Sequence, residues 1–146
     1  MKKQQLLVVS GPIANLTEKP GYTLDVLCWR TDINACLQQA AIGMNIEVTS
    51  QHYNDTATLT DQLQQAGRVD GILINTGDLA LESQSLCRTL RFIKVPCIEV
   101  FTSHFSADKT HRHQSIVASE CVGVIGGFGN YSYLLALAAL ANLLLP

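Results

Sequence analysis

Charged residues are scarce in this sequence. Lysine, arginine, aspartate and glutamate make up 15% of the 146 residues, and the formal net charge is −2. A protein that binds nucleic acid through its phosphates usually carries a basic stripe, and no such stripe occurs here. The composition therefore argues against a nucleic-acid partner. The lightly charged surface also favours burial of part of it in a homo-oligomer.

Disulfide and metal-binding patterns are missing as well. No C-x-x-C pair and no Cys/His cluster with zinc spacing occurs. The cysteines are odd in number and scattered, at Cys28, Cys36, Cys87, Cys97 and Cys121. Scattered free thiols are typical of a reducing cytoplasm. We therefore expect a cytoplasmic protein with no metal and no other cofactor.

Long hydrophobic runs are absent too. The N-terminal "MKKQQLLVVSGP" has a basic start but a short apolar run and no small-residue cleavage pattern, so we expect a first strand and not a signal peptide. The C-terminal "YLLALAALANLLLP" is shorter than the ~20 apolar residues that a membrane helix needs. It predicts a buried helix, and we expect no membrane partner.

What the sequence does contain is an alternation of short apolar runs and segments with helical periodicity. The apolar runs predict strands at 5–10, 46–52, 69–75, 96–101 and 121–129. The periodic segments predict helices at 23–43, 56–67, 82–92 and 131–145. Thr23 suits a helix N-cap and Gly43 a C-terminal stop.

Strands that alternate with helices predict right-handed crossovers and a parallel sheet covered on both faces. We therefore expect residues 1–146 to form a single α/β domain, a flavodoxin-like three-layer sandwich. Its five-stranded parallel sheet should have the order 2-1-3-4-5. Ligands of such folds bind at the carboxyl ends of the strands. The functional surface is accordingly expected at 11–22, 75–82, 101–112 and 126–130.

Four segments at these strand ends form a recognisable series. They are "LLVVSGPIANL", "VDGILINTG", "PCIEVFTS" and "HRHQSIVASECVGVIGGFGNYSYLLALAAL". In order, they resemble the N-G-P-N-L-N motif, the V-D-G-I-V-I-N-P-G strand, the P-V-V-E-V-H-L-S strand and the R-H-H-S run with its G-V-I-x-G-F-G strand of the type II 3-dehydroquinases. Those flavodoxin-like enzymes dehydrate 3-dehydroquinate to 3-dehydroshikimate. The resemblance covers nearly the whole chain.

The resemblance implies that several ligand-holding residues are kept. Asn75 matches an asparagine that contacts substrate hydroxyls, although an asparagine before Thr-Gly also suits a turn. Thr102 and Ser103 match a pair whose backbone N–H groups bind the substrate carboxylate; an ordinary strand-to-loop turn is the alternative. Arg112 matches an arginine that reaches substrate hydroxyls, and a solvated surface side chain is its alternative.

The groups that perform the family's anti elimination are mostly altered. The family's base is a loop tyrosine activated by an arginine, whereas the shorter "TEKPGYTL" offers Tyr22 as candidate base and Lys19 as candidate activator. An exposed loop tyrosine is the alternative. The family's acid is a histidine oriented by the glutamate two residues before it. Here Glu99 keeps that glutamate, but Phe101 replaces the histidine and cannot transfer a proton.

Three further positions depart from the family pattern. Ile13 replaces the asparagine of the first motif, which supports the intermediate. Leu81 replaces a second substrate histidine. Arg88 replaces an aspartate that the family contributes from a neighbouring subunit, and this reversal of charge would change both pocket and interface.

The loss of the histidine leaves Glu99 as a carboxylate inside an apolar strand, where an unpaired charge is costly. We expect a backbone N–H, a loop histidine, Arg112 or water as its new partner. The loop histidines are His104, His111 and His113. Replacement of the missing acid by His104 is one hypothesis; an exposed loop histidine is the alternative.

Three functions are compatible with these residues. The first is a dehydroquinase-like protein with weak or lost activity and a pocket for a small carboxylated ligand related to 3-dehydroquinate, quinate or shikimate. The second is an active dehydratase of the shikimate or quinate pathway, with Tyr22 as base and a replacement acid. The third is a non-catalytic structural or regulatory module. The resemblance also implies a trimer-based homo-oligomer, and dodecamers are common in the family.

Overall fold

A single parallel sheet forms the centre of the fold. The computed structural model describes residues 2–10, 33–53, 55–65, 69–76, 84–102 and 115–145. Over these residues the five strands have the order β2-β1-β3-β4-β5, and every neighbouring pair is parallel, as predicted. The strands are β1 (Gln4–Ser10), β2 (Ile46–His52), β3 (Gly71–Asn75), β4 (Cys97–Phe101) and β5 (Gly123–Gly126).

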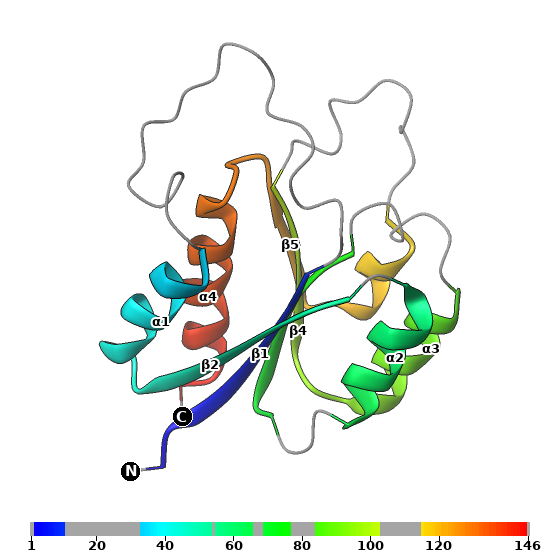
Figure 1. Cartoon of the computed structure of the whole chain (residues 1–146), viewed down its shortest axis with the longest axis horizontal. Helices are drawn as coiled ribbons and strands as arrows, with labels where there is room; N and C mark the ends of the chain where they lie inside the picture. The colour runs from blue at the N-terminus through cyan, green and yellow to red at the C-terminus, as the bar shows by residue number, and fades with distance from the viewer. Residues whose placement is uncertain are drawn as a thin grey trace.

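Helices cover both faces of this sheet, which makes three layers (Figure 1). The helices α1 (Ile33–Ile42) and α4 (Tyr131–Leu143) lie on one face, and α2 (Thr56–Gln65) and α3 (Gln84–Ile93) lie on the other. Each layer of helices encloses its own apolar cluster against the sheet. No helix within the described ranges has the length and apolar character needed to cross a membrane.

The central strands are buried because they have neighbours on both edges and helices on both faces. All five residues of β3 and all five of β4 are buried. After β1 the chain adds β2 on one side of this strand and then crosses to add β3 on its other side. Ser10, the last residue of β1, therefore stands in register with Asn75, the last residue of β3. This pair marks the topological switch point, where ligands of such folds bind.

The structure departs from the prediction around the last strand. The prediction placed a strand at 121–129, but β5 contains only Gly123–Gly126. It ends there because Gly127 has φ 96° and Gly129 has φ 60°, which turn the chain out of the extended conformation. The 3₁₀ helix η4 (Val117–Glu120) before β5 was not predicted.

The other boundaries agree closely with the prediction. Strand β3 begins two residues later than expected, at Gly71, and α4 ends at Leu143. Helix α1 ends at Ile42, directly before the predicted stop at Gly43. Its predicted beginning at Thr23 lies outside the described residues. The four cysteines that the structure describes, Cys36, Cys87, Cys97 and Cys121, are free thiols.

Candidate functional site

Buried polar side chains gather at the carboxyl edge of the sheet, around the ends of β1, β3 and β4. Ser10, Asn75, Thr76 and Glu99 are all buried there, with exposed fractions of 9% or less. Most of the other buried residues are apolar. Buried polar groups are stable only when hydrogen-bonded, so their partners define the architecture of this edge.

A side-chain network joins the two strands of the switch point. The Asn75 Nδ2 group donates to the Tyr133 hydroxyl at 2.8 Å. The Tyr133 hydroxyl is also 2.9 Å from Ser10 Oγ. Tyr133 belongs to α4 and is 2% exposed. Burial raises its pKa, against the opposing effect of the hydrogen bonds to Ser10 and Asn75, so the phenol keeps its proton at neutral pH.

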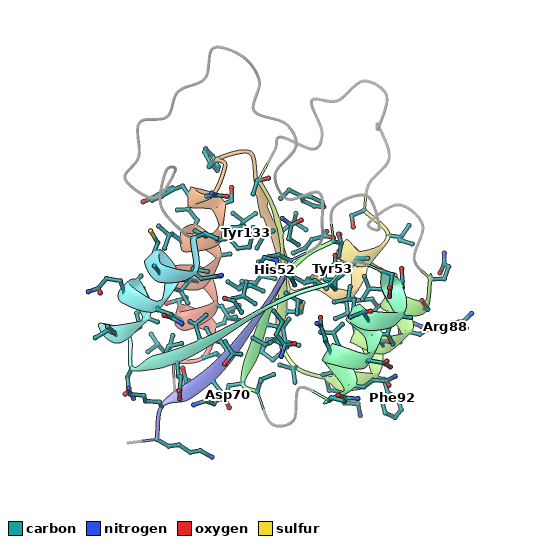
Figure 2. All side chains as sticks on the ribbon, in the orientation of Figure 1. His52, Tyr53, Asp70, Arg88, Phe92 and Tyr133 are labelled. Atoms are coloured by element: carbon teal, nitrogen blue, oxygen red, sulfur yellow. The ribbon has the colours of Figure 1, made fainter. Side chains whose placement is uncertain are left out.

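A second buried tyrosine holds the main chain of the same pair. The Tyr53 hydroxyl donates to the Asn75 carbonyl oxygen at 2.7 Å, and the Tyr53 N–H donates to the Ser10 carbonyl oxygen at 3.2 Å. Tyr53 follows β2 and packs in the apolar cluster on the α2/α3 face, whereas Tyr133 packs on the α1/α4 face. Figure 2 shows the two tyrosines on either side of the sheet near its carboxyl edge. The ends of β1 and β3 are thus held from both faces.

The side chain of Glu99 has partners that the sequence did not suggest. Its Oε2 accepts hydrogen bonds from Thr76 Oγ1 at 3.0 Å and from Ser115 Oγ at 2.8 Å. Two hydroxyls therefore bind this oxygen, whereas a backbone N–H, a loop histidine, Arg112 or water was expected; the loop histidines and Arg112 lie outside the described residues. Its Oε1 has no hydrogen-bond partner among the described residues. Burial raises the pKa of Glu99, and the hydrogen bonds from Ser115 and Thr76 oppose this shift.

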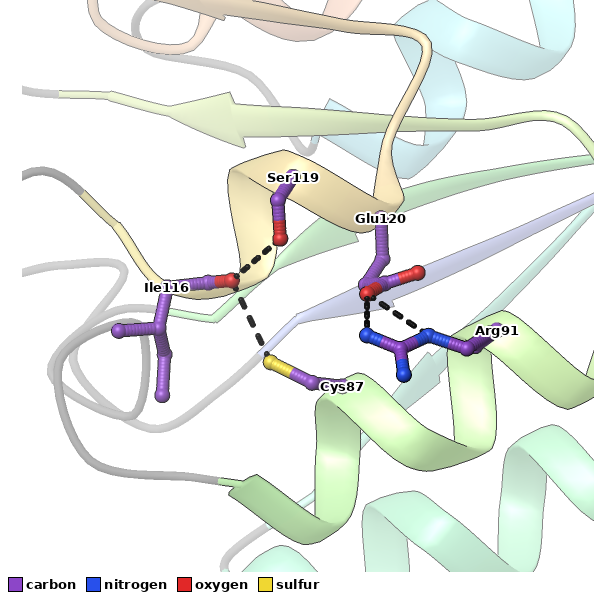
Figure 3. Close-up of polar contacts among 5 residues, drawn as sticks. All are labelled: Cys87, Arg91, Ile116, Ser119 and Glu120. Atoms are coloured by element: carbon purple, nitrogen blue, oxygen red, sulfur yellow. Dashed lines mark hydrogen bonds and ion pairs between the residues drawn. The ribbon is translucent and has the colours of Figure 1, made fainter.

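Ser115 reaches Glu99 because the turn after it is anchored to α3. Its Oγ also accepts the N–H of Val117, the first residue of η4. Cys87 Sγ on α3 donates to the Ile116 carbonyl oxygen at 3.3 Å, and the Arg91 guanidinium binds the Glu120 carboxylate (Figure 3). These contacts fix η4 against α3. Ser115 lies two residues before η4, so the same contacts place its hydroxyl near Glu99.

Phe101 ends β4 with its side chain buried at 6% exposure. Glu99 and Phe101 project from the same face of the strand, because side chains alternate along it. The chain beyond Phe101 is held by the turn between β5 and α4. The Gly127 N–H donates to the Phe101 carbonyl oxygen at 3.3 Å, and the Gly129 N–H donates to that of Thr102 at 2.8 Å.

Several of the residues singled out from the sequence are not part of the described structure. They are Ile13, Lys19, Tyr22, Leu81, Ser103, His104, His111, Arg112 and His113. Arg88 is described: it is exposed on α3 and points away from the sheet in Figure 2. The structure thus brings together Asn75, Glu99, Phe101 and Thr102 at one edge of the sheet. Among the described residues, no group of three or more His, Cys, Asp or Glu side chains is arranged to hold a metal ion.

Sequence reasoning missed five polar residues of this edge, which are Ser10, Tyr53, Thr76, Ser115 and Tyr133. Two of them carried a usable signal. Thr76 stands at the proline position of the N-P-G motif, and Ser10 ends the first strand at the switch point. The periodicity of α4 marks Tyr133 only as a core residue, because no pattern along the chain shows that its hydroxyl reaches β1 and β3.

A doubly wound parallel sheet with buried polar side chains at its switch point is typical of α/β proteins whose ligands bind at the carboxyl edge of the strands. Residues 4–141 match the family Dehydroquinase class II. The chain therefore belongs to the class II dehydroquinase family.

Individual relatives agree with this assignment. The chain is 35% identical to the 3-dehydroquinate dehydratase of Rhizobium johnstonii, over 96% of this chain and 97% of that protein. It is 38% identical to the 3-dehydroquinate dehydratase of Alkalilimnicola ehrlichii, over 92% of this chain and 90% of that protein. The crystal structure of the type II dehydroquinase from Butyrivibrio crossotus superimposes with a TM-score of 0.81 at 27% identity, over 94% of this chain and 97% of that chain.

Proposed function

We propose that this member of the family binds a carboxylated, hydroxylated ring related to 3-dehydroquinate, quinate or shikimate, and that its dehydratase activity is weak or lost. The ligand would meet Asn75, the turn at Thr102 and Ser103, and Arg112. Backbone donors at such a turn do not depend on the side chains present, so a carboxylate site there tolerates sequence change.

The surroundings of Glu99 are the observation that carries this proposal. Elimination of water needs an acid that protonates the departing hydroxyl. Phe101 occupies the position that the family resemblance assigns to this acid, and its ring has no proton to give. The two hydroxyls on Glu99 Oε2 fit a carboxyl group that no longer orients a histidine.

An active dehydratase is the second candidate. The names of the relatives favour it, because proteins 35% and 38% identical over nearly the whole chain are called 3-dehydroquinate dehydratase. In this case Tyr22 would act as the base, and a residue other than position 101 would supply the acid.

One assay separates the two candidates. Purified protein is incubated with 3-dehydroquinate, and formation of product is followed by the absorbance of its conjugated enone. We expect little or no turnover; robust turnover would establish the active dehydratase. Melting temperatures are measured in parallel with quinate, shikimate and simple dicarboxylates. A ligand that binds only the folded state raises apparent stability, so the absence of any shift would count against the binding site.

The variant Phe101→His tests the missing acid directly. An imidazole at this position would have Glu99 Oε1, which has no partner among the described residues, available to orient its N–H group. General acid catalysis typically contributes about 10²–10⁴-fold, so we expect turnover to rise by at least about tenfold. Phe101→Leu is the matched control, because it also removes the ring but adds no proton donor. Equal turnover in the two variants would contradict the proposed role of position 101.

A further inference from the structure

Three cysteines gather on the α2/α3 face of the sheet. Cys87 of α3 and Cys97, the first residue of β4, are buried members of the apolar cluster on this face. Cys121, directly after η4, packs against the same cluster. Cys36 lies on α1, which covers the opposite face of the sheet. Among the described cysteines, a bond between two side chains is therefore to be sought in the first three.

Cys97 and Cys121 are in direct contact, because a hydrogen bond joins their thiols. Their main chains also lie side by side, since the Val122 N–H donates to the Cys97 carbonyl oxygen at 2.8 Å. Cys121 is extended, with φ −106° and ψ 153°. Neighbouring strands are about 4.8 Å apart and successive residues about 3.3 Å, so the two α-carbons should be about 6 Å apart. This separation suits a disulfide.

Cys87 has a different partner. Its Sγ donates to the Ile116 carbonyl oxygen at 3.3 Å (Figure 3). Burial raises the pKa of the Cys87 thiol. Because a thiol reacts as its thiolate, this shift makes Cys87 less reactive toward oxidants and disulfides. Pairing of Cys87 with Cys121 is thus the weaker alternative.

The two thiols in contact differ in their access to solvent. Cys121 is partly exposed, whereas Cys97 is 2% exposed. The hydrogen bond to Cys121 and burial both raise the pKa of Cys97, so Cys97 keeps its proton. An oxidant in solution therefore meets Cys121 first, and Cys97 is placed to react second.

We propose that Cys97 and Cys121 are a redox-sensitive pair, which hydrogen peroxide converts to a disulfide that ties the end of η4 to β4. The Cys121 thiolate attacks one peroxide oxygen, the O–O bond breaks, and a sulfenic acid and water result. The Cys97 sulfur then attacks the Cys121 sulfur; the S–O bond breaks, and the hydroxide leaves as water with the Cys97 proton. Two thiols and one peroxide thus give one disulfide and two waters.

The bond would strengthen the attachment of η4 to the sheet. Val117 is the buried apolar anchor of η4. The ion pair of Arg91 with Glu120 adds little, because the Arg91 side chain is 73% exposed. The disulfide would close the chain segment between Cys97 and Cys121 into a covalent loop and so reduce the entropy of the unfolded chain.

Peptide mapping tests the pairing in the wild-type protein. Each of the five cysteines lies on a different tryptic peptide, and those of Cys97 and Cys121 are 95–109 and 113–146. Folded protein is treated with hydrogen peroxide, remaining thiols are alkylated, and the digest is analysed by mass spectrometry. We expect these two peptides to be linked and to separate on reduction. Linkage of Cys87 to Cys121, or sulfinic acid at Cys121 beside an unmodified Cys97, would overturn the proposal.

Melting temperatures test the structural effect of the bond. Oxidation should raise the melting temperature of the wild type by at least about 5 °C, and dithiothreitol should reverse the rise. Cys121→Ser should show no rise. Cys36→Ser is the matched control, because Cys36 is also partly exposed but lies on the other face, and it should behave as the wild type. A linked peptide without a rise in melting temperature would overturn the tie between η4 and β4.

Discussion

At the scale of single residues, Glu99 stands out because it is the buried acidic side chain among the described residues. It is fully buried, and within the described structure the hydrogen bonds from Thr76 and Ser115 both reach the same oxygen of its side chain. Neutral hydroxyls compensate a buried charge less well than a cation would. Burial therefore dominates, and the pKa of the Glu99 carboxyl is raised.

This raised pKa predicts a particular dependence of stability on pH. The folded state holds the Glu99 proton more tightly than the unfolded chain, so its contribution to stability is complete below the unfolded pKa. It is lost as pH rises through the folded pKa. Glu99→Gln has no such proton. We therefore expect the stability of Glu99→Gln relative to the wild type to increase from pH 4 to pH 8, by ~1.4 kcal/mol for each unit of pKa elevation.

Urea unfolding at several pH values tests this expectation. Thr76→Val serves as the control of opposite sign, because it removes a hydroxyl that favours the charged carboxylate. Its deficit relative to the wild type should grow over the same pH range. Parallel stability curves for the wild type and Glu99→Gln would show that Glu99 does not titrate differently in the folded and unfolded states.

The residues of the candidate site could be predicted only in part. Asn75, Glu99 and Phe101 follow from their places at strand ends, because strand periodicity and the family motifs fix those places. The partners of Glu99 do not follow. Ser115 is 16 residues away in sequence and is brought close by η4, an element that no periodicity predicted. Hydroxyl pairing across elements depends on tertiary placement, about which a single sequence says little.

At the scale of elements, the approach of α4 to the start of β3 depends on a glycine. A Cβ added at Gly71 would lie 2.8 Å from Cδ2 of Leu140 and 2.8 Å from Cδ2 of Leu6. Both leucines are almost completely buried, so neither can move aside freely. We expect Gly71→Ala to lower the free energy of unfolding by about 1–3 kcal/mol, which is the usual cost of overpacking.

Gly123→Ala is the matched control, because Gly123 is also the first residue of its strand. A Cβ at Gly123 would meet no atom of the non-adjacent described residues within 4 Å. Alanine restricts the unfolded chain more than glycine does, so this variant should be neutral or more stable by up to about 1 kcal/mol. Urea unfolding of both variants measures the difference. Equal effects would mean that the close contact at Gly71 does not limit how α4 packs.

The elements themselves were largely predictable, for a physical reason. Buried parallel strands need continuous apolar runs, and amphipathic helices need apolar residues on one face, so both leave a period in the sequence. The errors occur where this signal fails. In "CVGVIGGFG" the apolar residues continue past the end of β5, and only the positive φ angles of Gly127 and Gly129 end the strand. Glycine permits positive φ angles, but its presence in the sequence does not show that the angle is positive.

At the scale of the whole molecule, one sheet separates two apolar clusters that share no buried residue. Leu137 of α4 belongs to one cluster and Leu59 of α2 to the other, and both are fully buried. The two clusters nevertheless depend on each other, because alternate side chains of the same strands project into each. The loss of packing on one face therefore weakens the strands that support the other face.

This dependence predicts that the two faces unfold together. Leu137→Ala and Leu59→Ala should each lower the free energy of unfolding by about 2–5 kcal/mol, through lost burial and the cavity that remains. Native-state hydrogen exchange then measures the protection of the backbone amides of α2 and of α4 separately. We expect each variant to reduce protection in both helices by the same free energy, because both open only through global unfolding. If Leu137→Ala reduced protection in α4 but left α2 unchanged, the face that carries Tyr133 would be an independent unit. The position of Asn75 would then depend on a layer that can open while the rest of the sheet stays folded.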